Sequence, residues 1–597
     1  MTTEDEHKNA ASQKMQENIA RIEALTERMV GALSHKRAPN VALEGPGPDL
    51  QISASTALMK EWMEKPSKIF EAQTNYWSQA LKHYVEATES LAQGTFSPPA
   101  EPGQSDPRFK NPLWDSHPYF NFIKQQYLIA SKGVQDAVDQ LDDIDDIDRK
   151  RLTYFARQIV DLMAPTNFLA TNPDALEKAL QTEGESLVKG LENLVRDLEA
   201  NNGDLLVTLA DKDAFVVGEN IGTAEGSVVY RNRLFELIQY KPTTETVHKT
   251  PLIIFPPWIN RFYIMDLKPQ NSLIRWVVDQ GFTLFIVSWK NPDKSYADVG
   301  LEDYVQEGYL DAIDQVKALT GEPKVNAVGY CIAGTTLSLT LGLLNKRKDR
   351  SINSATFFTT LTDFSDQGEF AVFLQDDFVD GIEKQCEADG VLSSYFMSRT
   401  FSFLRSRDLI YQPAIRSYMM GEAPPAFDLL FWNGDSTNLP GKMAVQYLRG
   451  LCQKDMFAGK GFEVLGETVS VRDVNVPLMA IACEGDHIAP WIASFNGIAQ
   501  MGSKDKQFIL SESGHIAGIV NPPSKKKYGH YTSTAPVADP NEWKAKAEFH
   551  EGSWWPHWGQ WLAKKSGKMV PARAPGGPDH KILCAAPGTY VKEVVKI

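Results

Sequence analysis

The segment KVNAVGYCIAGTTLSLTLGLLNK (324–346) decides the fold of this chain. Its first part is a short apolar run typical of a buried β-strand, and the part after Cys331 reads as a helix. Gly329 and Gly334 flank the cysteine. Small neighbours permit the tight strand-to-helix turn that projects a reactive side chain at the edge of a sheet. A helix that begins there would also favour the thiolate form of Cys331.

Two observations qualify this interpretation. A lone cysteine is more often a buried structural residue than a nucleophile, but the strand-turn-helix context favours the nucleophile. The usual pattern around such a residue, G-x-[SC]-x-G, has glycine where this chain has Ala333. Alanine is the smallest possible departure, so we expect the turn to form.

Further short apolar runs surround this segment and alternate with helical patterns. Two amphipathic helices are expected at 272–280 and 304–319. The other strand candidates are PLIIFPP (251–257), TLFIVSW (283–289), ATFFTTL (355–361), PLMAIAC (477–483) and QFILSES (507–513). Strands that are apolar on both faces and alternate with helices are typical of a mostly parallel sheet in an α/β protein.

The rest of the chain lacks this alternation of strand and helix patterns. Residues 1–53 are polar with a Pro/Gly-rich end, and we expect a tail and linker. Residues 54–200 have helical spacing and predict a helical N-terminal domain. Within the catalytic domain at 201–597, the aromatic-rich stretch 365–470 interrupts the alternation and predicts an inserted cap.

Two polar residues follow the last strand candidates. Asp486 comes after PLMAIAC, and His515 comes after QFILSES. The chain order of nucleophile, acid and histidine is that of α/β-hydrolases, so we expect that fold with Cys331, Asp486 and His515 as its triad. His487 is a rival base, although a role in orienting its loop or the substrate is favoured.

The triad requires donors for the oxyanion that forms at the attacked carbonyl. One is expected from the backbone N–H of Ile332, and the second from the loop PPWINRFY (256–263), at Ile259 or Asn260. A cysteine nucleophile converts one thioester into another, which keeps the acyl group activated for transfer.

Composition excludes several classes of protein. The formal charge of -15 over 597 residues is unsuited to nucleic acid binding. Five cysteines without a CxxC pair exclude a disulfide scaffold or a cysteine zinc site and suit a reducing cytosol. The acidic run LDDIDDID (141–148) lacks the glycine of a calcium loop, so a solvated helix face is favoured and no metal is expected. The polar N-terminus and the absence of a long apolar run predict a cytoplasmic protein without a transmembrane segment.

Several long segments resemble one known family, the class I polyhydroxyalkanoate (poly-3-hydroxybutyrate) synthases. The similarity covers nearly everything after about residue 54. The segments that carry it are FLATNPDAL (168–176), GENIGTAEGSVVYRN (218–232), QYKPTTETVH (239–248), PPWINRFYIMDLKPQNSLIRWVVDQG (256–281), FIVSWKNPD (285–293), GYCIAGTTL (329–337), LLFWNGDSTNLPG (429–441), EGDHIAPW (484–491) and SGHIAGIVNPP (513–523).

The resemblance implies polymerisation of (R)-3-hydroxyacyl-CoA, with short-chain units such as 3-hydroxybutyryl-CoA preferred, and release of CoA. It implies that Cys331 carries the acyl group, that His515 deprotonates Cys331, and that Asp486 orients His515 and activates the incoming 3-hydroxyl. No cofactor is implied, because the CoA thioester is the substrate. It further implies a homodimer on cytoplasmic polyester granules, in contact with granule-associated proteins through the helical N-terminal region.

Four basic residues are candidates for contact with the CoA phosphates. Lys525, Lys526 and Lys527 form a cluster after the histidine loop, and Arg405 in the cap is a weaker candidate. A solvated loop is an equally good interpretation of the lysines. Two other functions compete with polymerisation: a cysteine-based thioesterase or lactonase of the same fold, and a noncatalytic granule-binding protein.

Overall fold

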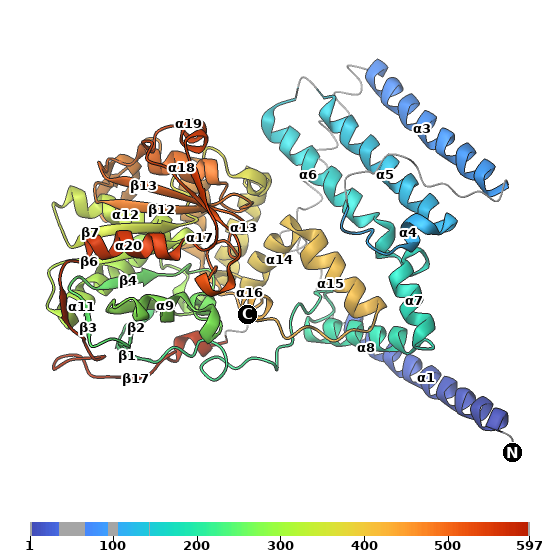
Figure 1. Cartoon of the computed structure of the whole chain (residues 1–597), viewed down its shortest axis with the longest axis horizontal. Coiled ribbons are helices and arrows are strands. Elements are labelled where there is room, and N and C mark those ends of the chain that lie inside the picture. The colour runs from blue at the N-terminus through green and yellow to red at the C-terminus, as the bar shows by residue number, and fades with distance from the viewer. Residues whose placement is uncertain (1–2, 35–65, 93–105, 142–143, 595–597) are drawn as a thin grey trace. The chain divides into compact units, whose positions relative to one another are not determined.

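The computed structural model describes residues 3–34, 66–92, 106–141 and 144–594 (Figure 1). The chain divides into two compact units, described separately below. The helical unit comprises Met1–Asp211 with Arg399–Pro425, and the sheet unit comprises Lys212–Ser398 with Ala426–Ile597. The end of the predicted tail and linker (1–53) and the beginning of the predicted helical domain (54–200) lie outside the described residues, because 35–65 are not among them.

An eleven-stranded sheet forms the centre of the sheet unit, in the order β15-β14-β13-β12-β7-β6-β4-β5-β2-β1-β17. The six strands from β13 to β5 are parallel to one another, and β2 joins them antiparallel to β5. The strands are β1 (Gly226–Arg231), β2 (Phe235–Tyr240), β4 (Leu252–Phe255), β5 (Leu284–Trp289), β6 (Val325–Tyr330), β7 (Ile352–Phe358), β12 (Leu478–Cys483), β13 (Lys506–Ser511), β14 (His530–Thr532), β15 (Glu548–His550) and β17 (Cys584–Ala585).

This order confirms the predicted α/β-hydrolase fold. All six predicted strands are present as β4, β5, β6, β7, β12 and β13, and they form the parallel part of the sheet. Three two-stranded sheets are added to it, β3 (Thr246–His248) with β16 (Met569–Pro571), β8 (Val391–Leu392) with β9 (Leu439–Pro440), and β10 (Phe462–Val464) with β11 (Glu467–Val469).

Helices accompany the strands along the chain of the sheet unit. They are α9 (Leu273–Asp279), α10 (Leu301–Asp303), η6 (Tyr304–Leu310), α11 (Asp311–Thr320), α12 (Ile332–Lys346), α13 (Asp376–Asp389), α16 (Asp428–Asn433), α17 (Gly441–Gln446), η10 (Tyr447–Gln453), α18 (Trp491–Gln500), α19 (Pro540–Ala545) and α20 (Trp555–Lys565). Helix α14 (Ser394–Leu404) spans the boundary between the two units.

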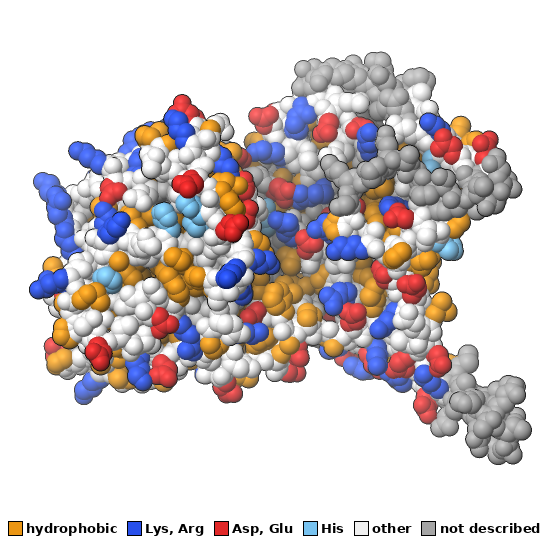
Figure 2. Space-filling model, viewed as in Figure 1, with side chains coloured by type: hydrophobic (Ala, Val, Ile, Leu, Met, Phe, Trp, Pro, Cys, Tyr) orange, Lys and Arg blue, Asp and Glu red, His pale blue; other side chains and the backbone are white. Residues whose placement is uncertain are grey.

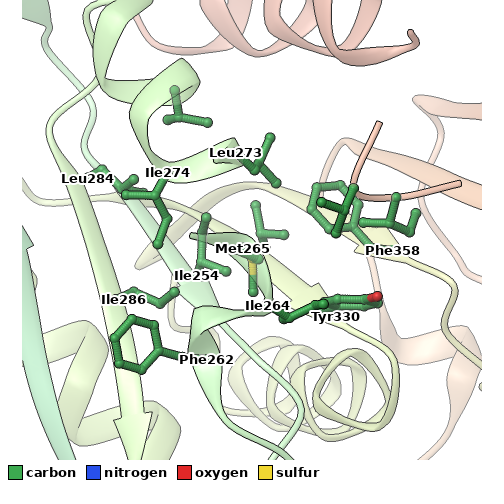
Figure 3. Close-up of a cluster of buried hydrophobic side chains, with 14 of the residues drawn as sticks. Ile254, Phe262, Ile264, Met265, Leu273, Ile274, Leu284, Ile286, Tyr330 and Phe358 are labelled. Carbon is green, nitrogen blue, oxygen red and sulfur yellow. The ribbon is translucent and has the colours of Figure 1, made fainter. Parts of the chain in front are cut away.

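Both faces of the sheet are buried, which explains the uninterrupted apolar runs of its strands. On one face, Ile254 and Ile286 pack with Leu273 of helix α9 in the cluster of Figure 3. The next residue after Ile254, Phe255, stacks on Tyr309 of η6, with ring centroids 4.2 Å apart. Since successive residues of a strand point to opposite faces, the two layers of helices require apolar side chains at every position.

The helical unit contains α1 (Thr3–Ser34), α3 (Pro66–Ala92), α4 (Leu113–Ser116), α5 (Pro118–Asp139), α6 (Asp146–Leu162), α7 (Pro173–Gln181), α8 (Glu185–Ala200) and α15 (Gln412–Ala414). Within the acidic run 141–148, Asp145 caps α6 by accepting from two backbone N–H groups of its first turn. Helix α1 corrects the assignment of residues 1–53 to a polar tail. Leu25 packs against Val188 and Val195 of α8, so one buried stripe holds an otherwise polar helix.

The predicted insertion also differs from the structure. Only part of 365–470 stays with the sheet unit, because Arg399–Pro425 groups with the helical unit, which itself extends to residue 211 rather than 200. The side-chain amide of Asn193 in α8 donates to the carbonyl oxygens of Ser417 and Glu422, at 3.1 and 3.0 Å. These hydrogen bonds fix the segment on α8.

Two features are absent from the part of the chain that the structure describes. None of the helices in that part of the chain is long and apolar enough to cross a bilayer. No group of three or more His, Cys, Asp or Glu side chains in the same residues has a metal-binding arrangement. On the face of the sheet unit drawn in Figure 2, acidic and basic side chains are interspersed.

Candidate active site

Cys331 sits at the turn between strand β6 and helix α12. Its backbone has φ 55° and ψ −127°, a conformation that residues other than glycine rarely adopt. The Cys331 N–H donates to the carbonyl of Phe358 at the end of β7, and the Cys331 carbonyl accepts from Gly334. The strained backbone is therefore fixed by hydrogen bonds on both sides, and strain of this kind is typical of functional sites.

The two glycines beside Cys331 are required by close approach of the chain to itself. A Cβ at Gly329 would lie 2.5 Å from the Cα of Gly334, and a Cβ at Gly334 would lie 2.0 Å from Oγ1 of Thr360. Ala333 is fully buried, and its carbonyl accepts from the hydroxyl of Tyr309 at 2.8 Å. The structure thus accommodates the alanine that departs from the usual pattern.

Asp486 and His515 are brought together by two neighbouring loops that leave strands β12 and β13. The backbone N–H groups of Glu484 and Gly485 donate to the carbonyls of Ser511 and Ser513, both at 2.8 Å. His515 Nδ1 lies 2.6 Å from Asp486 Oδ2. The parallel pairing of the two strands thus sets the distance between the acid and the histidine.

The Asp486 carboxylate is oriented before any substrate arrives. Its Oδ1 accepts from the backbone N–H groups of Ile488 and Ala489, each at 2.9 Å, while Oδ2 faces His515. His515 is held from the other side by Tyr330, whose ring is stacked on the imidazole with centroids 6.0 Å apart. The Tyr330 hydroxyl also donates to the His515 carbonyl at 3.3 Å.

Cys331 also interacts with the His515 imidazole, so a thiol, an imidazole and a carboxylate come together. Burial disfavours a charged imidazole, but the interactions of His515 with Asp486 and with Cys331 outweigh it and raise the pKa of His515 well above its usual value. A histidine with a raised pKa beside a carboxylate is suited to act as a general base toward a neighbouring thiol.

The predicted oxyanion donors lie at the same edge of the sheet. Ile332 is the first residue of α12, so its N–H has no acceptor within the helix. The loop 256–263 begins beside the elbow, because Phe255 of β4 pairs with Gly329 of β6. The indole of Trp258 donates to the hydroxyl of Thr336 in α12 at 3.2 Å, which ties the loop to the helix.

Ile259 and Asn260 differ in the partners of their N–H groups. The Asn260 N–H lies 3.4 Å from the carbonyl of Pro257, which already occupies it. The carbonyl of Trp258 accepts from the hydroxyl of Thr437 at 2.8 Å. Because the C=O and N–H of a trans peptide point in opposite directions, the Ile259 N–H points away from Thr437.

An aromatic residue of the insertion, Tyr447 of η10, lies near Cys331. Burial raises the pKa of the Tyr447 hydroxyl, with smaller contributions from Cys452 and Cys331. Its ring lies 5.8 Å from that of Trp258 and 6.0 Å from that of Phe364. Sequence reasoning missed Tyr447, because it belongs to no local motif.

The insertion continues this aromatic character within the sheet unit. The rings of Phe370, Phe373, Phe378 and Phe396 form a chain in which successive centroids are 5.7–6.1 Å apart. Phe373 and Phe396 are buried. An apolar wall of this kind disfavours water near the regions that it covers.

The remaining candidates are more peripheral. His487 is partly buried on the Asp486 loop, but the Asp486 carboxylate pairs with His515. Lys525, Lys526 and Lys527 are exposed. Lys527 Nζ lies 4.7 Å from the centroid of the Tyr528 ring. Lys527, together with Ser513 in the histidine loop, lowers the pKa of the Tyr528 hydroxyl.

Arg405 belongs to the helical unit, where its Nη1 lies 4.0 Å from an Asp408 carboxylate oxygen. It is therefore not one of the residues that the sheet unit assembles around Cys331. The cap interpretation that suggested it placed the whole of 365–470 over the strands.

Comparisons with known proteins give consistent results. A family model described as poly-beta-hydroxybutyrate polymerase (PhaC) N-terminus matches residues 105–277. A model described as alpha/beta hydrolase fold matches residues 251–522, in agreement with the sheet topology. The second match contains the elbow, the acid loop and the histidine loop.

Individual relatives extend the similarity over most of the chain. The poly(3-hydroxyalkanoate) polymerase of Methylorubrum extorquens is 41% identical over 90% of this chain and 89% of its own length. The poly(3-hydroxyalkanoate) polymerase subunit PhaC of Rhizobium meliloti (strain 1021) is 40% identical over 89% of this chain and 87% of its own. The corresponding subunit of Cupriavidus necator is 37% identical over 88% of this chain and 89% of its own.

Proposed function

This chain belongs to the poly(3-hydroxyalkanoate) polymerase family, and we propose that Cys331, His515 and Asp486 carry out its reaction. It is an acyltransferase that polymerises 3-hydroxyacyl units from CoA thioesters into polyhydroxyalkanoate. The observation that carries the proposal is the meeting of a thiol, an imidazole and a carboxylate at the carboxyl ends of β6, β13 and β12.

Acylation begins when His515 takes the proton of Cys331 and the thiolate attacks the thioester carbonyl. The tetrahedral intermediate collapses with cleavage of the bond to the CoA sulfur, and His515 returns the proton to the departing thiolate. The products are CoA and an acyl thioester on Cys331. General base catalysis of this kind contributes about 10²–10⁴ in rate.

Elongation requires the 3-hydroxyl of another unit to attack the acyl thioester on Cys331. We assign activation of this hydroxyl to the Asp486–His515 pair. The hydroxyl oxygen forms the new ester bond, its proton passes to the pair, and the Cys331 thiolate leaves. The proposed chemistry uses only the thioester and the side chains of this protein, without a cofactor.

The oxyanion formed in each step is assigned to the N–H groups of Ile332 and Ile259. Ile259 is preferred to Asn260 because the Asn260 N–H already donates to the Pro257 carbonyl. The Ile259 N–H instead points away from the Thr437 hydroxyl, which binds the carbonyl of the same peptide. Loss of one donor of this kind typically reduces the rate about 10²–10³-fold.

The CoA phosphates are assigned to Lys525, Lys526 and Lys527. These lysines are exposed, and they connect through Tyr528 and Ser513 to the loop of His515. Clustered ammonium groups pair well with phosphate oxygens. Arg405 is retained as a weaker candidate for the same role.

The class I assignment, the preference for short-chain (R)-3-hydroxyacyl-CoA, homodimer formation and location on cytoplasmic granules are further proposals. Contact with a polyester surface is supported by the apolar side chains that helix α3 exposes. These are Trp77, Leu81, Tyr84 and Val85, with exposed fractions of 65%, 63%, 54% and 43%. Their spacing places them on one face of the helix. Granule-associated proteins are the other partners that such a face suits.

Product analysis tests the function directly. We expect 3-hydroxybutyryl-CoA to yield free CoA and insoluble polyester. Free 3-hydroxybutyrate as the main product would instead support a thioesterase or lactonase. Release of CoA that is unaffected by Cys331→Ala would contradict the assignment of the nucleophile.

A further inference from the structure

Two segments far apart in the sequence run side by side at the site. The loop 256–263 is called the oxyanion loop, and residues 432–437 are called the brace. Asn260 and Ser436 form an antiparallel bridge. The other contacts are Thr437 Oγ1 to the Trp258 carbonyl at 2.8 Å, Thr437 N–H to the Ile259 carbonyl at 3.2 Å, Trp432 Nε1 to the Arg261 carbonyl at 2.7 Å, Arg261 Nε to Asp435 Oδ1 at 3.3 Å, and Tyr263 hydroxyl to Asp435 Oδ2 at 2.8 Å.

We propose that the brace holds the oxyanion loop in its working conformation, with Thr437 as the positioning residue that aims the N–H of Ile259. This inference rests on the proposed function, because it concerns a donor to the reaction at Cys331. Thr437 itself touches no reacting atom in this scheme. It acts through the peptide that joins Trp258 and Ile259.

The geometry supports this role for Thr437 in particular. The Thr437 hydroxyl donates to the carbonyl of Trp258, and the Thr437 N–H donates to the carbonyl of Ile259. These two carbonyls belong to the peptides before and after the Ile259 Cα. Fixing the Trp258 carbonyl fixes the Ile259 N–H, since both belong to one rigid peptide plane. Rotation of that plane would move the donor away from the oxyanion, where small displacements are costly.

Burial makes these hydrogen bonds hard to replace. Thr437 and Trp258 are each 1% exposed, so water has little access to the carbonyl that the hydroxyl serves. An unpaired carbonyl in such surroundings is unfavourable, and the peptide would turn to find another donor. The loss of one hydroxyl is therefore expected to change the orientation of the donor as well as the local stability.

The far end of the oxyanion loop is anchored separately. Arg261 is 3% exposed, and its guanidinium donates to the carbonyls of Tyr590 and Glu593 at 3.1 and 2.5 Å. The Glu593 carboxylate is itself held by Lys290, at 2.7 Å. Because this anchor remains when Thr437 is changed, we expect the loop to stay in place while the Ile259 peptide loses its orientation.

The test compares Thr437→Val, which removes the hydroxyl and keeps the shape, with Thr437→Ser, which keeps the hydroxyl. In the full chain, we expect Thr437→Val to lower kcat for CoA release about 10–100-fold, with KM changed less than about twofold. This is less than the about 10²–10³-fold loss for a missing oxyanion donor, because the Ile259 N–H is misoriented and not removed. Thr437→Ser should stay within about threefold of wild type, because its hydroxyl still serves the Trp258 carbonyl.

Alkylation of Cys331 by iodoacetamide supplies the second readout. This reaction displaces iodide from a tetrahedral carbon and forms no oxyanion, so it reports on the thiol and His515 alone. We expect Thr437→Val to be alkylated at the wild-type rate. Equal falls in alkylation and CoA release would indicate general distortion of the site and would overturn the proposal, as would a Thr437→Val enzyme with wild-type kcat.

Two further variants make the test decisive. Thr320→Val is a matched control, because the Thr320 hydroxyl also donates to a backbone carbonyl, that of Val316 at 2.7 Å inside α11, away from the loop. If Thr437→Val does not fold, Tyr263→Phe tests the proposal in its place, because it removes the hydrogen bond to Asp435 in the brace. We expect this variant to lower kcat about 3–10-fold through weaker positioning of the oxyanion loop. An unchanged kcat would overturn the proposal. CoA release by Cys331→Ala would instead show that the proposed function itself fails.

Discussion

His515 Nδ1 lies 2.6 Å from Asp486 Oδ2, and this contact joins the loops that follow two neighbouring parallel strands. The Asp486 carboxylate has two backbone N–H donors on its other oxygen, so its position does not depend on the histidine. Since Nδ1 faces Asp486, the remaining nitrogen, Nε2, is the one available to Cys331. This arrangement gives Asp486 the role of fixing the tautomer of His515.

Asp486→Asn should therefore lower kcat for CoA release strongly. An amide at this position can present an N–H to Nδ1 and favour the wrong tautomer, and similar changes in catalytic triads reduce the rate about 10⁴-fold. Glu484→Gln is the matched control, because Glu484 is exposed on the same loop and pairs only with Lys544 among the ion pairs of the described residues. A modest effect of Asp486→Asn, below about tenfold, would argue against this role.

The elbow allows a prediction about neighbouring positions. Ala333→Gly should leave activity within about threefold of wild type, because the Ala333 side chain is not required for the turn and the carbonyl at this position remains held by Tyr309. Gly334→Ala should abolish activity or folding, since its new Cβ would lie 2.0 Å from Oγ1 of Thr360. CoA release and thermal unfolding would be measured for both. An active Gly334→Ala enzyme would contradict the described packing.

The lysine cluster predicts an effect on binding rather than on chemistry. Replacing Lys525, Lys526 and Lys527 with Gln should raise KM for the CoA thioester about tenfold at low salt and leave kcat unchanged, because each phosphate contact stabilises ground state and transition state alike. The matched control replaces Lys346, Arg347 and Lys348, an equal charge at the far end of α12. If KM is unchanged in the variant that replaces Lys525, Lys526 and Lys527, these lysines belong to a solvated loop and do not bind the CoA phosphates.

Acid stability should depend on His530 and His557, which form a cluster with His550 in which the rings lie 5.1–6.2 Å apart. Burial and the neighbouring histidines lower the pKa of His530. Burial, His550 and Lys564 lower the pKa of His557. A depressed histidine pKa means that the unfolded chain binds protons first as pH falls below about 6.5. Stability is therefore lost as pH drops through the folded-state pKa.

His557→Gln should reduce this loss. Between about pH 7.5 and pH 5.5, we expect its melting temperature to fall by about 2–4 °C less than that of wild type, which is the response of a large domain to 1 kcal/mol. His117→Gln, at an exposed position of the helical unit, serves as the control. Parallel declines for wild type and His557→Gln would show that the cluster does not govern acid stability.

The parallel part of the fold was predictable because burial on both faces leaves a local signal. Each of its strands is an apolar run, and the helices between them have a 3.6-residue period. The edge strands β14 and β15 have only three residues each, too few for a period to be recognised. Helix α1 was missed because a mostly polar sequence hides its buried stripe around Leu25.

The proximity of Cys331, Asp486 and His515 was predictable for the same local reason, since each of them lies in the loop or turn that follows a strand. The brace was not, because Thr437 and Trp258 meet only through the folded chain and neither carries a chemical signature in the sequence. The assignment of Arg399–Pro425 to the helical unit was missed for a similar reason. It depends on hydrogen bonds from Asn193, which lies in a distant part of the chain.

Intact-protein mass spectrometry after brief mixing with 3-hydroxybutyryl-CoA tests the central claim most directly, with peptide mapping to locate the adduct. We predict that wild type acquires a 3-hydroxybutyryl group on Cys331 while CoA is released, and that Cys331→Ala acquires none and releases no CoA. An acyl group on a different residue, or CoA release by Cys331→Ala at the wild-type rate, would contradict the account.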